Sequence, residues 1–190
     1  MNPLGVVLAG GVGRRIGGNK AMVELDGRPM LHYPLAVLHA VLDEVVIVCK
    51  EHTPLPDLGG MAPIWCEPET GFHPLYGVIA ALRTAGKPVL VCGADMPLVT
   101  PEVVDQIANA RDRAAAAVIP RSAGRLQPLL ALYRPEALPI LEAMEPNERA
   151  TDVVERLDPV ILDVADEHAF FNVNVPEDVL HASALRASRT

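Results

Sequence analysis

Short apolar runs rich in β-branched residues alternate with longer stretches of helical periodicity along this chain of 190 residues. Such alternation is typical of βαβ units built around a mostly parallel sheet. A chain of this length can bury a sizeable core within one domain. We therefore predict an α/β fold with three layers, α/β/α, a Rossmann-like and mostly parallel sheet, and a single domain over residues 1–190.

The expected elements follow from these runs and from turn and cap residues. Pro29 suits the first turn of a helix in the segment 28–44, and Pro34 predicts a kink there. A second helix in 74–86 ends at Gly86, a third in 100–114 begins at a Thr100 cap, and a last helix starts at Pro176. Strands are expected over Leu4 to Leu8, Glu44 to Cys49, Pro63 to Cys66, Pro88 to Cys92, Ala115 to Ile119, Leu129 to Arg134, Val160 to Val164 and Phe170 to Val173.

The first expected strand runs directly into the glycine-rich stretch "LAGGVGRRIGGNK", residues 8–20. Glycines after a buried strand let backbone N–H groups approach phosphates, and a nearby lysine adds charge. A P-loop needs Ser or Thr after its lysine, but Ala21 follows Lys20. A dinucleotide fingerprint needs a third glycine where Ile16 stands, and a helix directly after the loop. A glycine-rich turn with solvent-facing arginines stays open as an alternative.

Charge supports a small anionic ligand at this loop. The formal net charge of the chain is −8, which disfavours nucleic acids and anionic membrane surfaces as partners. The first 23 residues nevertheless hold Arg14, Arg15 and Lys20 and no acidic residue. No apolar run is long enough to span a membrane, no secretory signal pattern is present, and three cysteines that each end an apolar run are expected to be buried free thiols. A cytoplasmic location fits these features.

Asp95 is the strongest candidate for a metal ligand. It lies in "VLVCGADMP", just beyond an expected strand and at the sheet edge where the glycine loop should also lie. Carboxylates are ligands that Mg²⁺ prefers, and a turn or cap role is the alternative. None of the six histidines has the spacing of a zinc site.

The segment "LAGGVGRRIGGNK" resembles the signature L-A-G-G-x-S-x-R-M-G-x-x-K of the nucleotidyltransferase superfamily, which includes sugar-phosphate nucleotidylyltransferases. Together with "GADMP", "GRLQPLLALY" and "FFNVNVPEDV" it resembles the molybdenum cofactor guanylyltransferase family over nearly the whole chain. Enzymes of this family join GMP from GTP to the terminal phosphate of molybdopterin and release pyrophosphate. The resemblance implies a nucleotidyltransferase sheet, Mg²⁺ as cofactor, GTP and molybdopterin or molybdenum cofactor as substrates, and transient contacts with proteins of cofactor biosynthesis or molybdoenzyme maturation.

The same resemblance implies roles for particular residues. Arg15, Lys20 and Asp95 would be catalytic, with Arg15 and Lys20 on the phosphates and Asp95 on the magnesium ion and the nucleotide. Glu67 would contact the nucleoside, and Asn172 and Asn174 would line the site opposite Asp95, although a turn before the last helix explains the two asparagines equally well. The other substrate-binding positions are Leu8, Ala9, Gly10, Gly11 and Gln127.

Several residues depart from the family pattern. Gly13 stands where Ser or Ala is usual, Asn19 where Asp is common, and His73 and Tyr76 replace residues of a Gly-Pro-Leu-Ala-Gly segment. The last two departures bear on the acceptor more than on the nucleotidyl transfer. Molybdopterin cytidylyltransferases, phospholactate guanylyltransferases and a non-catalytic nucleotide-binding protein of the same fold remain alternatives.

Overall fold

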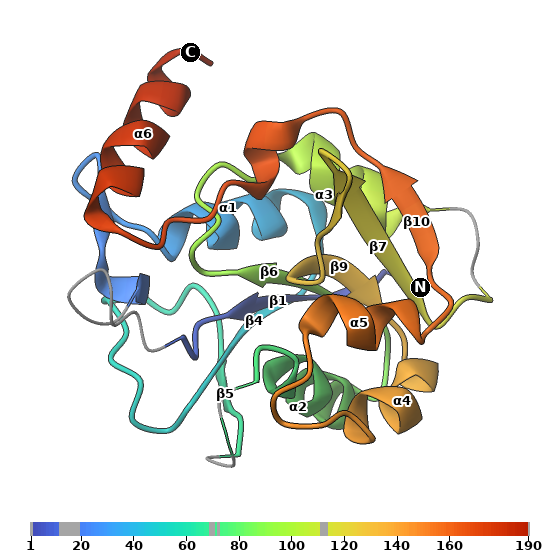
Figure 1. Ribbon diagram of the computed structural model, residues 1–190. Coiled ribbons are helices and arrows are strands. Elements are labelled where there is room, and N and C mark those ends of the chain that lie inside the picture. Colours follow the sequence, from blue (N-terminus) through green and yellow to red (C-terminus); the bar gives the residue numbers. More distant parts are fainter. Residues whose placement is uncertain (1, 12–19, 69–70, 72, 111–113, 190) are drawn as a thin grey trace.

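The computed structural model describes residues 2–11, 20–68, 71, 73–110 and 114–189 (Figure 1). Its main sheet has the strand order β10-β7-β9-β6-β1-β4-β5, and β8 pairs with β7. The neighbouring strands β6, β1, β4 and β5 are all parallel, and so are β10 and β7. Strand β9 runs antiparallel to both of its neighbours, β6 and β7. The strands are β1 (Leu4–Leu8), β4 (Val45–Cys49), β5 (Ile64–Cys66), β6 (Val89–Gly93), β7 (Ala117–Ser122), β8 (Arg125–Leu126), β9 (Leu130–Tyr133) and β10 (Val160–Asp163).

Helices cover both faces of this sheet. Figure 1 shows α1 and α3 on one face and α2, α4 and α5 on the other, so the expected α/β fold with a mostly parallel sheet is confirmed. A sixth helix lies to one side of the sheet, beside a short hairpin. The helices are α1 (His32–Val41), α2 (Tyr76–Ala85), α3 (Pro101–Ala108), α4 (Leu138–Glu142), α5 (Ala150–Glu155) and α6 (Pro176–Ala187), and the hairpin joins β2 (Glu24–Leu25) to β3 (Arg28–Pro29).

Strand β1 shows why this arrangement forms. Successive side chains of a strand point to opposite faces of the sheet. Val6 therefore joins the cluster that contains Leu82 of α2, and Val7 joins the cluster that contains Leu35 of α1. Both valines are fully buried, as a central strand covered by helices on both faces requires.

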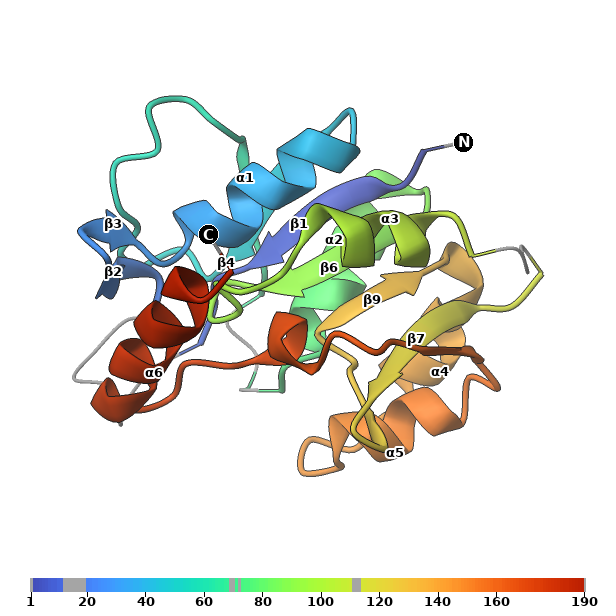
Figure 2. The same ribbon diagram turned by 90° about the horizontal axis from the view of Figure 1, so that it is seen from above.

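The sixth helix is fastened to the hairpin rather than to the sheet (Figure 2). The carboxylate of Asp26 accepts hydrogen bonds from Ser183 Oγ at 2.6 Å and Arg186 Nε at 3.1 Å. The Arg186 guanidinium also lies 4.2 Å from the centre of the Tyr33 ring, a cation–π contact. The hydrogen bond from Ser183 is the main reason that the pKa of Asp26 is lowered, and Arg186 adds to it.

Three helix boundaries fall where they were expected, and β7 is shifted, because it runs from Ala117 to Ser122 rather than over Ala115 to Ile119. The third helix begins at the Thr100 cap, whose side chain accepts a hydrogen bond from the Val103 backbone N–H, with Pro101 as the first helical residue. The second helix ends at Gly86, which adopts the left-handed conformation at φ 59°. The last helix starts at Pro176 as predicted.

Three expectations are wrong. The segment 170–173 is no strand: the 3-10 helix η4 (Glu167–Phe170) precedes it, and Val173 N donates to Asp95 O rather than entering a ladder. Pro29 lies in β3, and α1 begins three residues later, which places Pro34 in the first turn where a missing N–H causes no kink. Cys66 is exposed because β5 is the edge of the sheet, while Cys49 and Cys92 are buried as expected.

The hairpin, β8, α4 and α5 were not among the expected elements. Each of these elements has six residues or fewer, which is too short for a helical or strand periodicity of apolar residues to be recognised in the sequence. Within the described residues, no helix has the length and apolar character needed to cross a membrane.

Candidate active site

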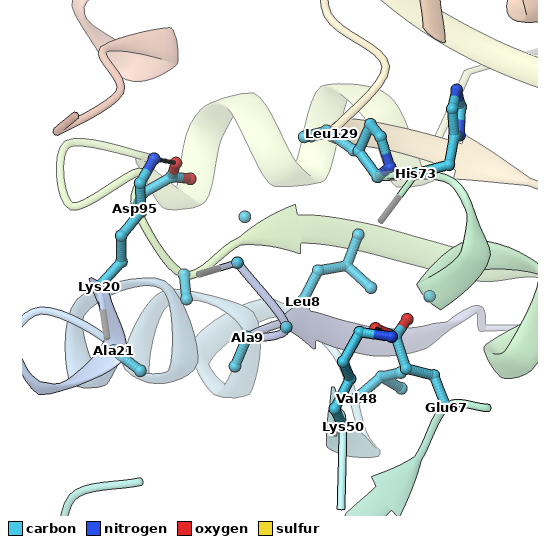
Figure 3. A pocket seen from close by; sticks show the side chains of 16 residues that line it. Leu8, Ala9, Lys20, Ala21, Val48, Lys50, Glu67, His73, Asp95 and Leu129 are labelled. Carbon is cyan, nitrogen blue, oxygen red and sulfur yellow. Dashed lines mark hydrogen bonds and ion pairs between the residues drawn. The ribbon is translucent and has the colours of Figure 1, made fainter. Parts of the chain in front are cut away.

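A cleft of about 230 Å³ opens at the carboxyl ends of the central parallel strands. Its floor is the segment Leu8 to Gly11, which follows β1. Figure 3 shows the two charged pairs of the cleft, Lys20 with Asp95 and Lys50 with Glu67, on either side of Leu8 and Ala9. The crevice beyond the carboxyl ends of the strands is the usual ligand site of an open α/β sheet.

The first charged pair, Lys20 and Asp95, has Asn174 as a third partner, so three distant parts of the chain meet here. Lys20 Nζ lies 2.7 Å from Asp95 Oδ2 and 2.5 Å from Asn174 Oδ1. The side chains of Lys20 and Asp95 are only 19% and 18% exposed, so this ion pair is partly shielded from water. The ammonium group therefore lies between a carboxylate and an amide oxygen at one end of the cleft.

Asp95 is held in place by the turn that follows β6. Ala94 N donates to Leu8 O at 3.0 Å, Met96 N donates to Gly93 O, and Asp95 O accepts from Val173 N at 2.9 Å. A Cβ at residue 93 would lie 2.6 Å from Asp95 Oδ1, so glycine is required there for the carboxylate to keep its position. The backbone thus aims the Asp95 side chain into the cleft.

Asn174 is positioned by the start of α6. Asp178 Oδ2 accepts hydrogen bonds from the backbone N–H groups of Asn174, at 2.7 Å, and Val175, at 3.0 Å. The Asn174 side-chain amide also donates to Asn172 O at 3.3 Å. An acidic residue in the first helical turn therefore fixes the residue that contacts Lys20.

The second charged pair lies at the opposite end of the cleft. Lys50 follows β4, Glu67 follows β5, and Lys50 Nζ lies 3.6 Å from Glu67 Oε1. Both side chains are about one-tenth exposed. A Cβ at Gly10 would lie 2.7 Å from Glu67 Oε1 and one at Gly77 would lie 3.1 Å from Glu67 Oε2, so two glycines make room for this carboxylate.

His73 lines the cleft beside the start of α2 and is buried. Its Nδ1 accepts from Leu75 N at 3.2 Å, so the proton lies on Nε2, which donates to Glu148 O at 2.9 Å. The Tyr76 ring packs edge-on against it, with 5.7 Å between ring centres. This departure from the family pattern therefore ties the wall of the cleft to the segment that leads into α5.

The structure brings together most of the residues expected at the site. Gln127 and Asn172 instead lie in a neighbouring depression shared with Thr151 and Phe170. Arg15 lies outside the described residues. Those that line the cleft are Leu8, Ala9, Gly10, Gly11, Lys20, Glu67 and Asp95, and Asn174 reaches it through Lys20.

Sequence reasoning missed Lys50 and Gly77. Lys50 is the first residue after a predicted strand, the same signal that singled out Asp95 after β6, and a search for charged residues at strand ends would have found it. Gly77 lies inside a helical pattern, and only the approach of Leu8 and Glu67 explains it: a Cβ there would lie 2.8 Å from Leu8 Cδ2.

Asp95 suits a magnesium ion that arrives with a nucleotide. Among the described residues no three His, Cys, Asp or Glu side chains are placed so that they could hold a metal ion together. A site with one carboxylate fits Mg²⁺, which usually keeps several waters and takes further oxygens from substrate phosphates. The donor set therefore fits an ion bridged to a polyphosphate and does not form a cage of protein ligands.

Comparison with known proteins places this cleft in a family. The family model of the MobA-like NTP transferase domain matches residues 5–160. The chain belongs to the MobA-like NTP transferases. The family membership expected from the glycine loop and the Asp95 segment is thereby confirmed.

Named members of the family align over almost the full length. A probable molybdenum cofactor guanylyltransferase of Thermococcus kodakarensis is 33% identical, over 96% of this chain and 95% of its own. A molybdenum cofactor guanylyltransferase of Shewanella sediminis is 32% identical, over 90% and 91%. The crystal structure of molybdopterin-guanine dinucleotide biosynthesis protein A from Archaeoglobus fulgidus superposes with a TM-score of 0.82 at 29% identity, covering 97% of this chain and 99% of that one.

Proposed function

We propose that this MobA-like NTP transferase transfers GMP from GTP to the terminal phosphate of molybdopterin, releasing pyrophosphate and forming a molybdopterin guanine dinucleotide. The contact of Lys20 with Asp95 and Asn174 at the carboxyl edge of the sheet carries the proposal, because it provides both a cation for phosphates and a carboxylate for a metal ion. Relatives named guanylyltransferases at about this chain's full length support the choice of nucleotide and acceptor.

The two ends of the cleft suit the two ends of a nucleotide. Lys20 and the backbone N–H groups of Gly10 and Gly11 would bind the phosphates, with Arg15 as a further phosphate ligand. Glu67 and Lys50 would then face the nucleoside. A carboxylate accepts hydrogen bonds from N1–H and the 2-amino group of guanine, whereas cytosine presents an acceptor at N3, so Glu67 favours guanine.

In the reaction an oxygen of the acceptor phosphate attacks the α-phosphorus of GTP. The new P–O bond forms as the bond to the β-phosphate oxygen breaks, and pyrophosphate carries away the electron pair. The acceptor oxygen is already ionised at neutral pH, so the chain needs no general base. Its residues mainly hold two polyanions in line and stabilise negative charge that develops on the leaving group.

Asp95 would hold Mg²⁺, which supplies charge neutralisation on the phosphates when it is bound. The Lys20 ammonium lies against Asp95 Oδ2. A bound polyphosphate would offer Lys20 further anionic partners beside this carboxylate.

Pyrophosphate release with each of the four nucleoside triphosphates, with and without molybdopterin, tests this function. We expect release with GTP only when both Mg²⁺ and the acceptor are present. A preference for CTP would make the chain a cytidylyltransferase, and a preference for phospholactate as acceptor would replace molybdopterin. GTP binding without release under any condition would identify a nucleotide-binding protein that does no chemistry. Pull-down from cells that assemble molybdoenzymes tests the expected transient contacts with maturation proteins.

A further inference from the structure

Two cysteines lie side by side on neighbouring strands next to the cleft. Cys49, the last residue of β4, is the register partner of Cys66, the last residue of β5. Neighbouring strands lie about 4.8 Å apart, and register partners of a parallel pair point to the same face of the sheet. A disulfide spans Cα atoms about 4.4 to 6.8 Å apart, so this pair falls within its reach.

The two thiols differ in exposure. Cys49 is 2% exposed, whereas Cys66 is exposed on the edge strand. Burial, with added repulsion from Cys66 and Glu67, raises the pKa of Cys49 to about 11. An oxidant therefore meets Cys66 first, and Cys49 stays protected until Cys66 has reacted.

We propose that Cys49 and Cys66 form a reversible disulfide that makes this edge of the cleft a redox modification site. Hydrogen peroxide oxidises the Cys66 thiol: an S–O bond forms, the O–O bond breaks and one water leaves. The Cys49 sulfur then attacks the Cys66 sulfur, the S–S bond forms and a second water leaves, so two thiols and one peroxide yield a disulfide and two waters. A dithiol such as dithiothreitol restores both thiols by exchange.

The disulfide would act on the residues that follow each cysteine. Lys50 follows Cys49, Glu67 follows Cys66, and Glu67 N donates to Cys49 O at 2.9 Å. A disulfide needs a Cβ–Cβ distance of about 3.8 Å, about 1 Å less than the strand spacing, so its formation draws the end of β5 toward β4. The Glu67 carboxylate lies close to the backbone of Gly10, where an added Cβ would be 2.7 Å from Glu67 Oε1. The shift therefore displaces Glu67 and weakens nucleotide binding.

Peptide mapping under non-reducing conditions, after treatment of the full chain with hydrogen peroxide, tests the disulfide directly. We expect a peptide that links Cys49 to Cys66 and disappears with dithiothreitol. Cys66→Ser should abolish it, while Cys92→Ala should leave it intact, because Cys92 lies on β6 with β1 between it and β4. Absence of the linked peptide, or oxidation of Cys66 to sulfinic acid alone, would overturn the proposal.

Titration calorimetry with Mg²⁺ and GTP tests the coupling, which rests on the proposed function. Oxidation should weaken GTP binding about fivefold or more, within the usual range for coupled sites, and dithiothreitol should restore it. Unchanged affinity of the linked protein would refute the coupling and leave the modification site standing. If the reduced protein binds no nucleotide, the proposed function fails and the mapping result is unaffected.

Discussion

Lys20 is the residue on which the site depends most. Its ammonium joins a carboxylate 75 positions away in sequence and an amide 154 positions away, at one end of a cleft built for a polyanion. A lysine is a compact point charge on a flexible stem, so it can turn from Asp95 to a phosphate without movement of the backbone. Under the proposed function this one side chain would serve both the phosphates and the Asp95 carboxylate.

Lys20→Ala should remove one positioned cation from the developing charge on pyrophosphate. We expect a loss of about 2 to 4 kcal/mol of transition-state stabilisation, a fall in kcat/KM of about 30-fold to 1000-fold. Steady-state pyrophosphate release measures it. Lys87→Ala is the matched control, since Lys87 pairs with Glu44 at the amino ends of β6 and β4, away from the cleft. A fall of less than threefold would show that Lys20 takes no part in stabilising the transition state.

Asp95→Asn should abolish magnesium-dependent pyrophosphate release, because the amide keeps the shape of the side chain and loses the charge that attracts the ion. Circular dichroism and the midpoint of thermal unfolding should stay close to those of the parent chain. Asp105→Asn, an exposed change on α3, controls for the loss of one acidic residue. Turnover near the parent value would contradict the metal assignment.

At the scale of elements, the start of α6 combines a helix cap with a contact to Lys20. Asp178 accepts two backbone N–H groups, one of them from Asn174, and Asn174 contacts Lys20. Asp178→Ala should therefore destabilise the fold by about 1 kcal/mol, as loss of a cap usually does. It should also lower kcat, whereas Glu177→Ala on the same turn should change neither. Urea unfolding and pyrophosphate release together measure the two effects; lost stability with unchanged kcat would show that Asn174 takes no part in the site.

The contact between α6 and the β2–β3 hairpin should weaken in acid. The pKa of Asp26 in the folded chain lies below its ordinary value of about 3.9, chiefly because of the hydrogen bond from Ser183. A lowered pKa gives stability that is present above the ordinary value and is lost as the pH falls through the folded value. The difference in free energy of unfolding between the parent and Asp26→Asn should therefore be largest near pH 7 and shrink toward pH 3. Urea unfolding of both proteins across this pH range measures the difference. A difference that grows in acid would contradict the lowered pKa of Asp26.

The elements that sequence predicted well are those with a local signal. The buried strand Leu4–Leu8 was predicted to the residue, and the Thr100 cap and Gly86 end follow from short-range chemistry. The segment 170–173 contains two phenylalanines and a valine, which favour a strand, yet Val173 N bonds to Asp95 O instead of to a neighbouring strand. That choice depends on tertiary contacts, which composition does not contain.

In the site, too, the residues with a local sequence signal were predicted and the contacts that depend on tertiary packing were not. Lys20, Glu67 and Asp95 each follow or precede a recognisable motif and were predicted to lie in the cleft. The contact of Lys20 with Asn174, and the space that Gly77 leaves for Glu67, need the packed structure, because no local pattern connects residues so far apart. Gln127 and Asn172 share a depression next to the cleft, and their predicted role with the substrate stays a prediction.

For the whole molecule, nucleotide binding should appear as added stability. At about 100 times the Kd, a ligand that binds only the folded chain adds about 2.7 kcal/mol. For a chain of this size that raises the Tm by about 5 to 10 °C. We expect this shift with Mg²⁺ and GTP, a smaller one when EDTA removes the metal ion, and none with ATP. Equal shifts with GTP and ATP would show that the cleft does not select guanine.

The bond between Lys20 and Asn174 also has a consequence for biosynthesis. Translation delivers the chain from its amino end, so Lys20 and the floor of the cleft emerge first, Asp95 follows, and Asn174 comes much later. A nascent chain that already contains β1, β4 and β6 still lacks one of the two groups that hold the ammonium. Completion of the polar end of the cleft thus coincides with a late stage of translation, and a chain stalled earlier would present an unfinished site.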